Sequence, residues 1–141
     1  MRHQPLEQIL SQASVVEAAP TLSRRERLLR WAEVLQAAEA RLLQPLRFVE
    51  FYAPAARARL RGEQTPLTLA FADPVLRSAG LAGDTLGQAQ AFFGLSDDDT
   101  HFLLCDCRWH GRMTGGRVAR RVRAVANPNV LNLLWMSFQR D

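Results

Sequence analysis

The strongest constraint on folding lies in residues 23–42, where a helix start signal precedes a single narrow apolar stripe. Ser23 and Glu26 have the spacing of a capping box, in which each side chain accepts a hydrogen bond from the backbone amide of the other residue. At about 100° per residue, the apolar residues that follow fall on one side of a helix and the charged residues fall opposite. The stripe consists of Leu28, Trp31, Leu35, Ala38 and Leu42. Residues 23–42 therefore predict a long amphipathic helix with one buried side.

Further helix start signals are spread along the rest of the chain. Thr65 and Asp73 each precede a proline, as expected of an N-cap followed by proline at the first helical position. Residues 67–71 also alternate between apolar and small residues, so a strand there stays open as the alternative. The pattern predicts an all-α fold, a single compact domain of five to seven short helices over residues 21–141. Residues 1–20 form a separate N-terminal amphipathic helix or mobile arm in this interpretation.

The composition is typical of one globular domain. The chain has 141 residues, of which 48% are hydrophobic and 23% are charged, enough to bury a core without a metal or a disulfide. No stretch approaches the roughly 18 consecutive apolar residues of a membrane span, and the N-terminus lacks the pattern of a signal peptide. We therefore expect a bacterial cytoplasmic protein. All basic residues are arginine, which indicates either a GC-rich genome or selection for planar, bidentate anion recognition.

Positive charge is concentrated in one segment, residues 108–123, which has six arginines and no carboxylate. Without these six, twelve arginines would face fourteen acidic residues, and the net charge would change from +4 to −2. A helix starting near Gly116 would place its valines on a buried face and its arginines on an exposed one. The amides of Gly115 and Gly116 would be available to anions, and Trp109 could stack on bases. The candidate anion- or partner-binding residues are Arg108, Arg112, Arg117, Arg120, Arg121, Arg123 and Trp109.

Two functions fit this basic segment. We favour a non-enzymatic bacterial interaction or adaptor protein whose arginine-rich surface docks an acidic protein partner. The alternative is a nucleic-acid-binding regulator that uses the same helix. Residues 85–104 resemble a helix-turn-helix, because Gly94, Leu95 and Ser96 form a compact turn between two predicted helices, the second of which Ser96 caps. However, the second of these helices begins with three aspartates, residues 97–99, which would repel DNA phosphates. We expect this unit to stay outside a DNA groove.

Four potential metal ligands lie within ten residues and support a third hypothesis, a small zinc or thiol enzyme. The set consists of His101, Cys105, Cys107 and His110. Imidazole and thiolate are the ligands that zinc prefers, but C-x-C is not the usual spacing of a zinc site. Cys105 also follows three apolar residues, so a buried reduced thiol is the simpler interpretation. We therefore expect no cofactor and no enzymatic activity, with zinc as the alternative.

The last predicted helix, from about Pro128 to Gln139, is apolar over most of its circumference. One face is broad enough to pack on the domain, and it consists of Leu131, Leu134, Trp135 and Phe138. The opposite side needs a second surface, and it consists of Val130, Leu133 and Met136. Two-fold pairing of like surfaces is the commonest way to cover such a face. We expect a homodimer with Trp135 or Met136 at or near its interface.

Overall fold

The protein is a small all-α domain, as the sequence predicts. The computed structural model describes residues 21–46, 55, 64–129 and 134–138. These residues are mostly helical, and their only sheet has two short strands. Within the same ranges, no helix combines the length and the apolar character needed to cross a bilayer. The predicted N-terminal arm, residues 1–20, lies outside the described residues.

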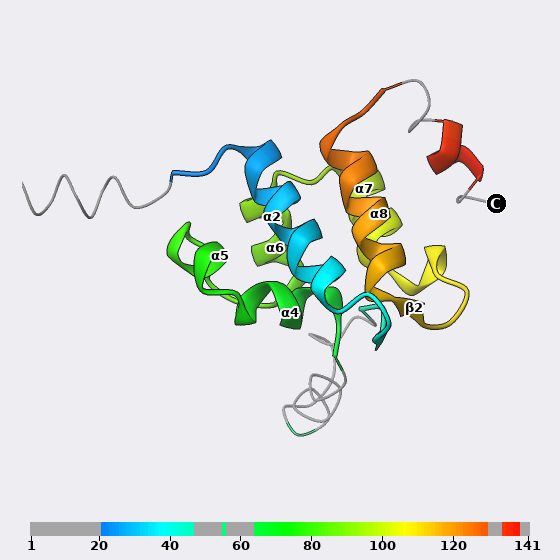
Figure 1. Cartoon of the computed structure of the whole chain (residues 1–141), viewed down its shortest axis with the longest axis horizontal. Coiled ribbons are helices and arrows are strands. Elements are labelled where there is room, and N and C mark those ends of the chain that lie inside the picture. The colour runs from blue at the N-terminus through cyan, green and yellow to red at the C-terminus, as the bar shows by residue number, and fades with distance from the viewer. Residues whose placement is uncertain (1–20, 47–54, 56–63, 130–133, 139–141) are drawn as a thin grey trace, which may run out of the picture.

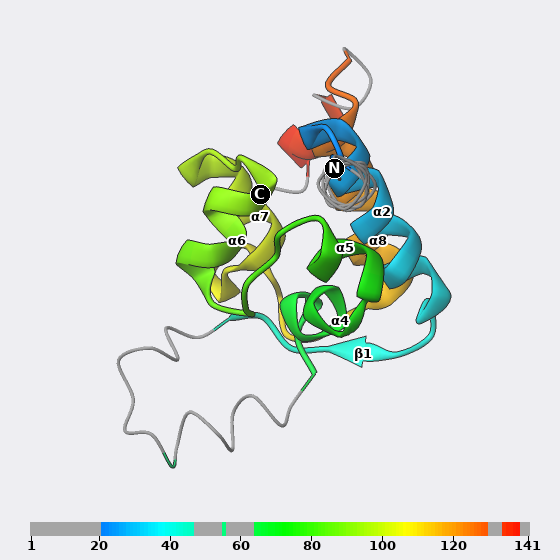
Figure 2. The ribbon, with the colours of Figure 1, turned by 90° about the vertical axis from the view of Figure 1, so that its left-hand side faces the viewer.

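The helices form two layers with two short helices beside them (Figures 1 and 2). Helices α2 (Arg24–Ala37) and α8 (Gly115–Ala126) lie side by side in one layer, and α6 (Leu86–Phe93) and α7 (Asp97–Leu104) form the other. Helices α4 (Pro66–Ala72) and α5 (Pro74–Ser78) adjoin α2. The short helix η2 (Asp106–Arg108) follows α7, and residues 134–138 are helical. Strand β1 (Leu42–Leu43) pairs antiparallel with β2 (Met113–Thr114), with Leu42 opposite Thr114.

The helix start signals are confirmed at each cap. The Ser23 hydroxyl accepts from the Glu26 amide at 3.2 Å, and the Glu26 carboxylate accepts from the Ser23 amide at 3.1 Å. Thr65, Asp73 and Ser96 are the N-caps of α4, α5 and α7. Each of these side chains satisfies an amide that the helix itself leaves without an acceptor. The strand alternative for residues 67–71 is therefore wrong.

Trp31 is at the centre of the core. Its side chain is fully buried, and its indole Nε1 donates to the carbonyl of Pro66 at 3.0 Å. Its ring stacks on Phe93 of α6 with 4.4 Å between centroids. One residue of the predicted stripe thus joins α2 to both α4 and α6, and a buried aromatic with its polar atom satisfied is a stable core element.

The predicted helix over residues 23–42 ends earlier, at Ala37. Leu42 lies in β1 and is 55% exposed, so its assignment to the buried stripe is wrong. The backbone after α2 turns toward the start of α8, where the carbonyls of Glu39 and Arg41 accept from the amides of Gly116 and Gly115 at 3.1 and 2.9 Å. These long-range hydrogen bonds replace those that a longer helix would have made.

Gly115 allows the backbone of α8 to lie in direct contact with the backbone at the end of α2. A β-carbon at this position would collide with the carbonyl oxygen of Ala38 and would lie 2.6 Å from that of Leu35. Both obstacles are backbone atoms, so they cannot rotate away as a side chain can. Only glycine fits where the two helices approach, and the amide of Gly115 donates a hydrogen bond to the carbonyl of Arg41.

We expect Gly115→Ala to lower the free energy of unfolding by about 2 kcal/mol or more, because the added methyl group forces α2 and α8 apart. The matched control is Gly87→Ala in α6, where a β-carbon would meet no atom within 4 Å. That change should raise stability by about 0.5–1 kcal/mol, because alanine favours a helix. Urea denaturation measures both, and equal effects would contradict the close approach at Gly115.

Candidate interaction surface

The arginine-rich helix α8 has the predicted valine face. Val118 and Val122 are fully buried and Val125 is 5% exposed, while Arg117 and Arg120 are exposed on the opposite side. Thr114 caps the helix by accepting from the Arg117 amide at 3.3 Å. Because the valine face packs toward α2 and α7, the arginine side of the helix faces outward.

Three of the arginines are positioned by neutral groups. The carboxamide oxygen of Gln44, oriented toward Arg112, accepts from its Nη2 at 3.1 Å and from its Nε at 2.6 Å. Arg123 donates to the side-chain oxygen of Gln36 at 3.1 Å. The guanidinium of Arg120 lies 4.7 Å from the centroid of the Trp135 ring. An amide oxygen or an aromatic face orients a guanidinium without cancelling its charge.

Within the described part of the chain, no carboxylate forms an ion pair with these three arginines or with Arg108. The ion pairs there involve Arg24 and Arg30, and none involves Arg108, Arg112, Arg120 or Arg123. Arg112 and Arg120 are exposed, and Arg108 and Arg123 are half-buried. We call the five residues Arg108, Arg112, Arg117, Arg120 and Arg123 the arginine surface. Neutral groups orient three members of this surface, Arg112, Arg120 and Arg123. No described carboxylate forms an ion pair with these three or with Arg108, so the positive charge of these four side chains is not compensated there.

Arg121 differs from its neighbours, and its predicted exposure is wrong. It is 1% exposed, and its Nη1 donates to the carbonyls of Phe102 at 2.7 Å and Arg108 at 3.2 Å. Its guanidinium also lies 4.6 Å from the Phe102 ring centroid. Burial, and then the nearby charges of Arg117 and Arg108, lower the pKa of Arg121 to about 10, so it stays charged at neutral pH. Arg121 joins α8 to the end of α7 and to the following loop.

Two other predicted contributors to anion binding are also unavailable. Trp109 is 4% exposed, so its ring is covered by the protein and is not presented to bases. The amides of Gly115 and Gly116 already donate to the carbonyls of Arg41 and Glu39. The start of α8 is therefore used for packing against α2 and has no free amides at these two positions.

The four potential metal ligands do not converge. Cys105 is buried at the end of α7, whereas His101, Cys107 and His110 are exposed. All four lie in the described part of the chain, where no three His, Cys, Asp or Glu side chains are close enough together to hold a metal ion. The cause is the backbone at Cys105, which pairs with Leu46 in a parallel bridge and turns this thiol into the core.

The C-terminal helix, residues 134–138, packs with a different face from the predicted one. Met136 is 5% exposed, and Trp135 is half-buried with its ring edge-to-face on Phe102, at 6.1 Å between centroids. Leu134 and Phe138 are 55% and 77% exposed. The large Trp135 ring fits between Phe102 and Arg120, which turns the helix so that Met136 faces inward. The other apolar residues of the prediction, Val130, Leu131 and Leu133, lie outside the described residues.

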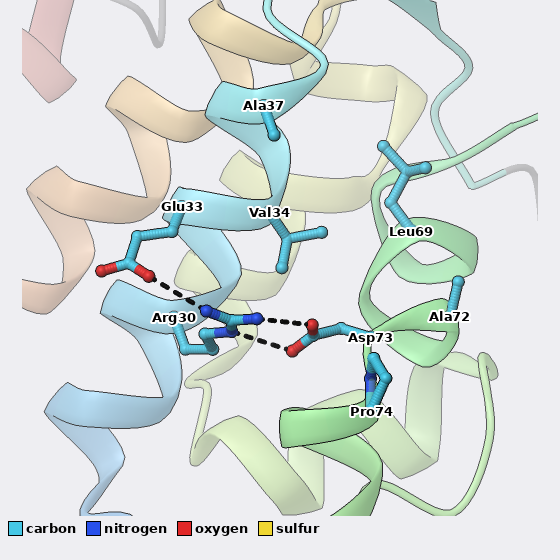
Figure 3. A pocket seen from close by; sticks show the side chains of 8 residues that line it. All are labelled: Arg30, Glu33, Val34, Ala37, Leu69, Ala72, Asp73 and Pro74. Carbon is cyan, nitrogen blue, oxygen red and sulfur yellow. Dashed lines mark hydrogen bonds and ion pairs between the residues drawn. The ribbon is translucent and has the colours of Figure 1, made fainter.

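A pocket of about 400 Å3 lies between α2, α4 and the start of α5 (Figure 3). Its apolar wall includes Val34 and Leu69, and at one end the Arg30 guanidinium holds the Asp73 carboxylate through two hydrogen bonds of 2.8 and 3.0 Å. Arg30 also donates to Glu33 at 3.3 Å. The hydrogen bonds from Arg30 hold the pKa of Asp73 below its ordinary value, against the opposing effect of burial. The charged groups of this pocket thus satisfy one another.

No protein-family model, curated protein or solved structure matches this chain. Its function must therefore be inferred from these two sites.

Sequence reasoning did not find the groups that position the arginines. Gln36 is 87 residues from Arg123, and a glutamine at that distance carries no signal that distinguishes it from any other surface amide. The Arg30 to Asp73 pair spans 43 residues in the same way. Only the cap role of Asp73 has a local signal, the proline that follows it.

We expect Arg121→Met to lower the free energy of unfolding by about 2–3 kcal/mol, because it removes the donor to the carbonyls of Phe102, in a buried hydrogen bond, and of Arg108, in a partly buried one. Arg117→Met, an exposed change on the same helix, should stay within about 0.5 kcal/mol. Thermal and urea denaturation compare the two variants. Similar losses for both would contradict the anchoring role of Arg121.

The Asp73 carboxylate should make the free energy of unfolding depend on pH in the acidic range. Its folded pKa is lowered, so its charge stabilises the fold above the unfolded value, and this contribution disappears as pH falls through the folded pKa. We expect Asp73→Asn, which keeps a cap acceptor, to cost about 1 kcal/mol at neutral pH, with a difference from the parent that shrinks below about pH 5. Melting curves from pH 7 to 3 measure this, with Asp98→Asn, a change at an exposed position of α7, as the charge-matched control. A difference that is constant over this range would contradict the ion pair.

Proposed function

We propose that this protein is a non-enzymatic, cytoplasmic interaction protein whose arginine surface docks an acidic protein partner. The observation that carries the proposal is the way Arg112, Arg120 and Arg123 are held. Each is oriented by a neutral group, and none forms an ion pair with a described carboxylate. Arg30 contrasts with them, because it pairs with the Asp73 carboxylate of its own chain, which compensates its charge.

Positioning by neutral groups favours binding. A guanidinium that is already oriented loses less conformational freedom when it pairs with a carboxylate, and its planar geometry suits a bidentate contact. The summed field of several arginines on one helix also attracts an acidic partner over a distance of about 10 Å at moderate salt.

Nucleic acid is the second candidate for the same surface, because phosphates also bind arginine bidentately. It is the weaker candidate, since the aromatic residue expected to stack on bases, Trp109, is buried. The start of α8 also lacks free amides for a phosphate at Gly115 and Gly116. An acidic protein needs neither feature.

The predicted homodimer through the C-terminal helix would need a different interface from the one expected from the sequence. Met136 is buried in its own chain and Trp135 is half-buried, so a second copy would contact Leu134 and Phe138 in their place. Such a two-fold contact would bring the Arg120 side chains of both copies together, because Arg120 covers Trp135. Charge repulsion thus disfavours this dimer relative to docking of an acidic partner.

Matched arginine variants test the proposal. Arg120 and Arg77 are both exposed and both lie over an aromatic ring, at 4.7 Å from Trp135 and 5.6 Å from Phe71. We expect Arg120→Gln to weaken binding of poly-L-glutamate by about threefold to tenfold, and Arg77→Gln to leave it unchanged. Fluorescence anisotropy at low salt measures both, with a labelled DNA duplex as the second probe.

Equal effects of the two variants, or no binding of poly-L-glutamate by the parent protein, would contradict the arginine surface as a docking site. Tighter binding of the duplex, with a steep loss of affinity as salt rises, would favour the nucleic-acid regulator.

A further inference from the structure

Among the described residues, the exposed large apolar side chains lie on segments that adjoin the arginine surface. In the described ranges there are three of them, Leu42, Leu134 and Phe138, at 55%, 55% and 77% exposure. None of the three lines the pocket between α2, α4 and α5, and none lies on α6 or α7. Scattered exposed apolar residues are ordinary, but Leu42 lies at the start of α8 and the segment 134–138 lies nearer its other end (Figure 1), so the apolar residues flank the arginines, as expected of a contact surface.

Leu42 lies at the start of α8. It is opposite Thr114 in the antiparallel pair of β1 and β2, and directly opposite residues place their side chains on the same face. The Thr114 side chain caps α8 at the Arg117 amide, so the Leu42 side chain lies beside the first turn of the arginine helix. Two residues further along the strand segment, Gln44 orients Arg112.

Leu134 and Phe138 belong to the helical segment that reaches α8 through the contact of Trp135 with Arg120. They are four residues apart on one helix and therefore share a face. Between them in sequence, Trp135 packs on Phe102 and lies beneath the guanidinium of Arg120. Arg120 thus connects the charged and the apolar parts of this surface.

Resting on the proposed function, we propose that the acidic partner presents an amphipathic segment in which apolar side chains flank a group of carboxylates. Helix α8 has 12 residues, a length on the order of 18 Å, which an amphipathic helix of three to four turns can span. Its carboxylates pair with the arginines, and its apolar side chains cover Leu42 at one end and Leu134 with Phe138 at the other.

Charge complementarity selects this occupant over a second copy of the chain. A copy that used the same face would place arginine against arginine at Arg120. Three exposed side chains also form a much smaller area than the roughly 800 Å2 per partner of a stable interface, so additional binding energy must come from the arginines. An acidic segment supplies that energy, whereas a like surface opposes it.

Two designed helical peptides of equal charge test the inference. In the first, leucines flank a run of glutamates, and in the second, serines replace the leucines. We expect the parent protein to bind the leucine peptide about tenfold more tightly in fluorescence anisotropy. Phe138→Ser and, independently, Leu42→Ser should each reduce this preference without changing the affinity for the serine peptide. Both positions are more than half exposed, so the variants should fold, and circular dichroism checks this.

The outcomes separate this inference from the proposed function. Equal affinity for the two peptides, with both weakened by Arg120→Gln, would overturn the apolar contribution and retain the acidic partner. Failure to bind either peptide would overturn both. A preference for the leucine peptide that survives both serine variants would place the apolar contact elsewhere and contradict the inference. If the protein binds the two peptides equally, dimerisation that depends on Phe138 in light scattering would also contradict the inference. Binding to phosphatidylglycerol vesicles that depends on Phe138 would contradict it in the same way.

Discussion

The close approach of α8 to the end of α2 at Gly115 is the contact on which the remaining arrangement depends. The amides of Gly115 and Gly116 donate to carbonyls beyond α2, and a side chain at Gly115 would meet backbone atoms. These hydrogen bonds fix where α8 begins and how it is rotated about its axis. With the rotation fixed, the valines face the core and Arg117 and Arg120 face outward.

Three environments around the arginines explain their different roles. Arg30 is paired with Asp73 and joins α2 to α4 and α5, so its charge is compensated where it stands. Arg121 is buried, where its hydrogen bonds to the carbonyls of Phe102 and Arg108 offset the cost of removing a cation from water. Arg112, Arg120 and Arg123 contact amide oxygens or a ring and remain at the surface with their charge intact. The local partner, and not the residue type, therefore determines which arginines are available for binding.

Local chemistry in the sequence was enough to predict the helix starts and the helical class. Capping residues, prolines at the first helical position and the valine spacing of α8 all act within a few residues of the chain. What the sequence could not predict depends on contacts between distant segments. Helix α2 ends at Ala37 because of α8, and Arg121 is buried because α7 presents a carbonyl to it. In the C-terminal helix, the fit of Trp135 between Phe102 and Arg120 decides which apolar residues face inward.

The side-chain Nε–H resonances of the arginines report most directly on whether the positioned arginines on α8 and just before it form the docking surface. A titration of the labelled protein with an acidic peptide, followed by proton–nitrogen NMR, reports on each guanidinium separately. We expect the resonances of Arg112, Arg120 and Arg123 to shift, while those of Arg30, already paired with Asp73, and of Arg77 on α5 stay in place. Shifts that are largest at Arg30 or Arg77, or that are spread evenly over all arginines, would contradict this expectation.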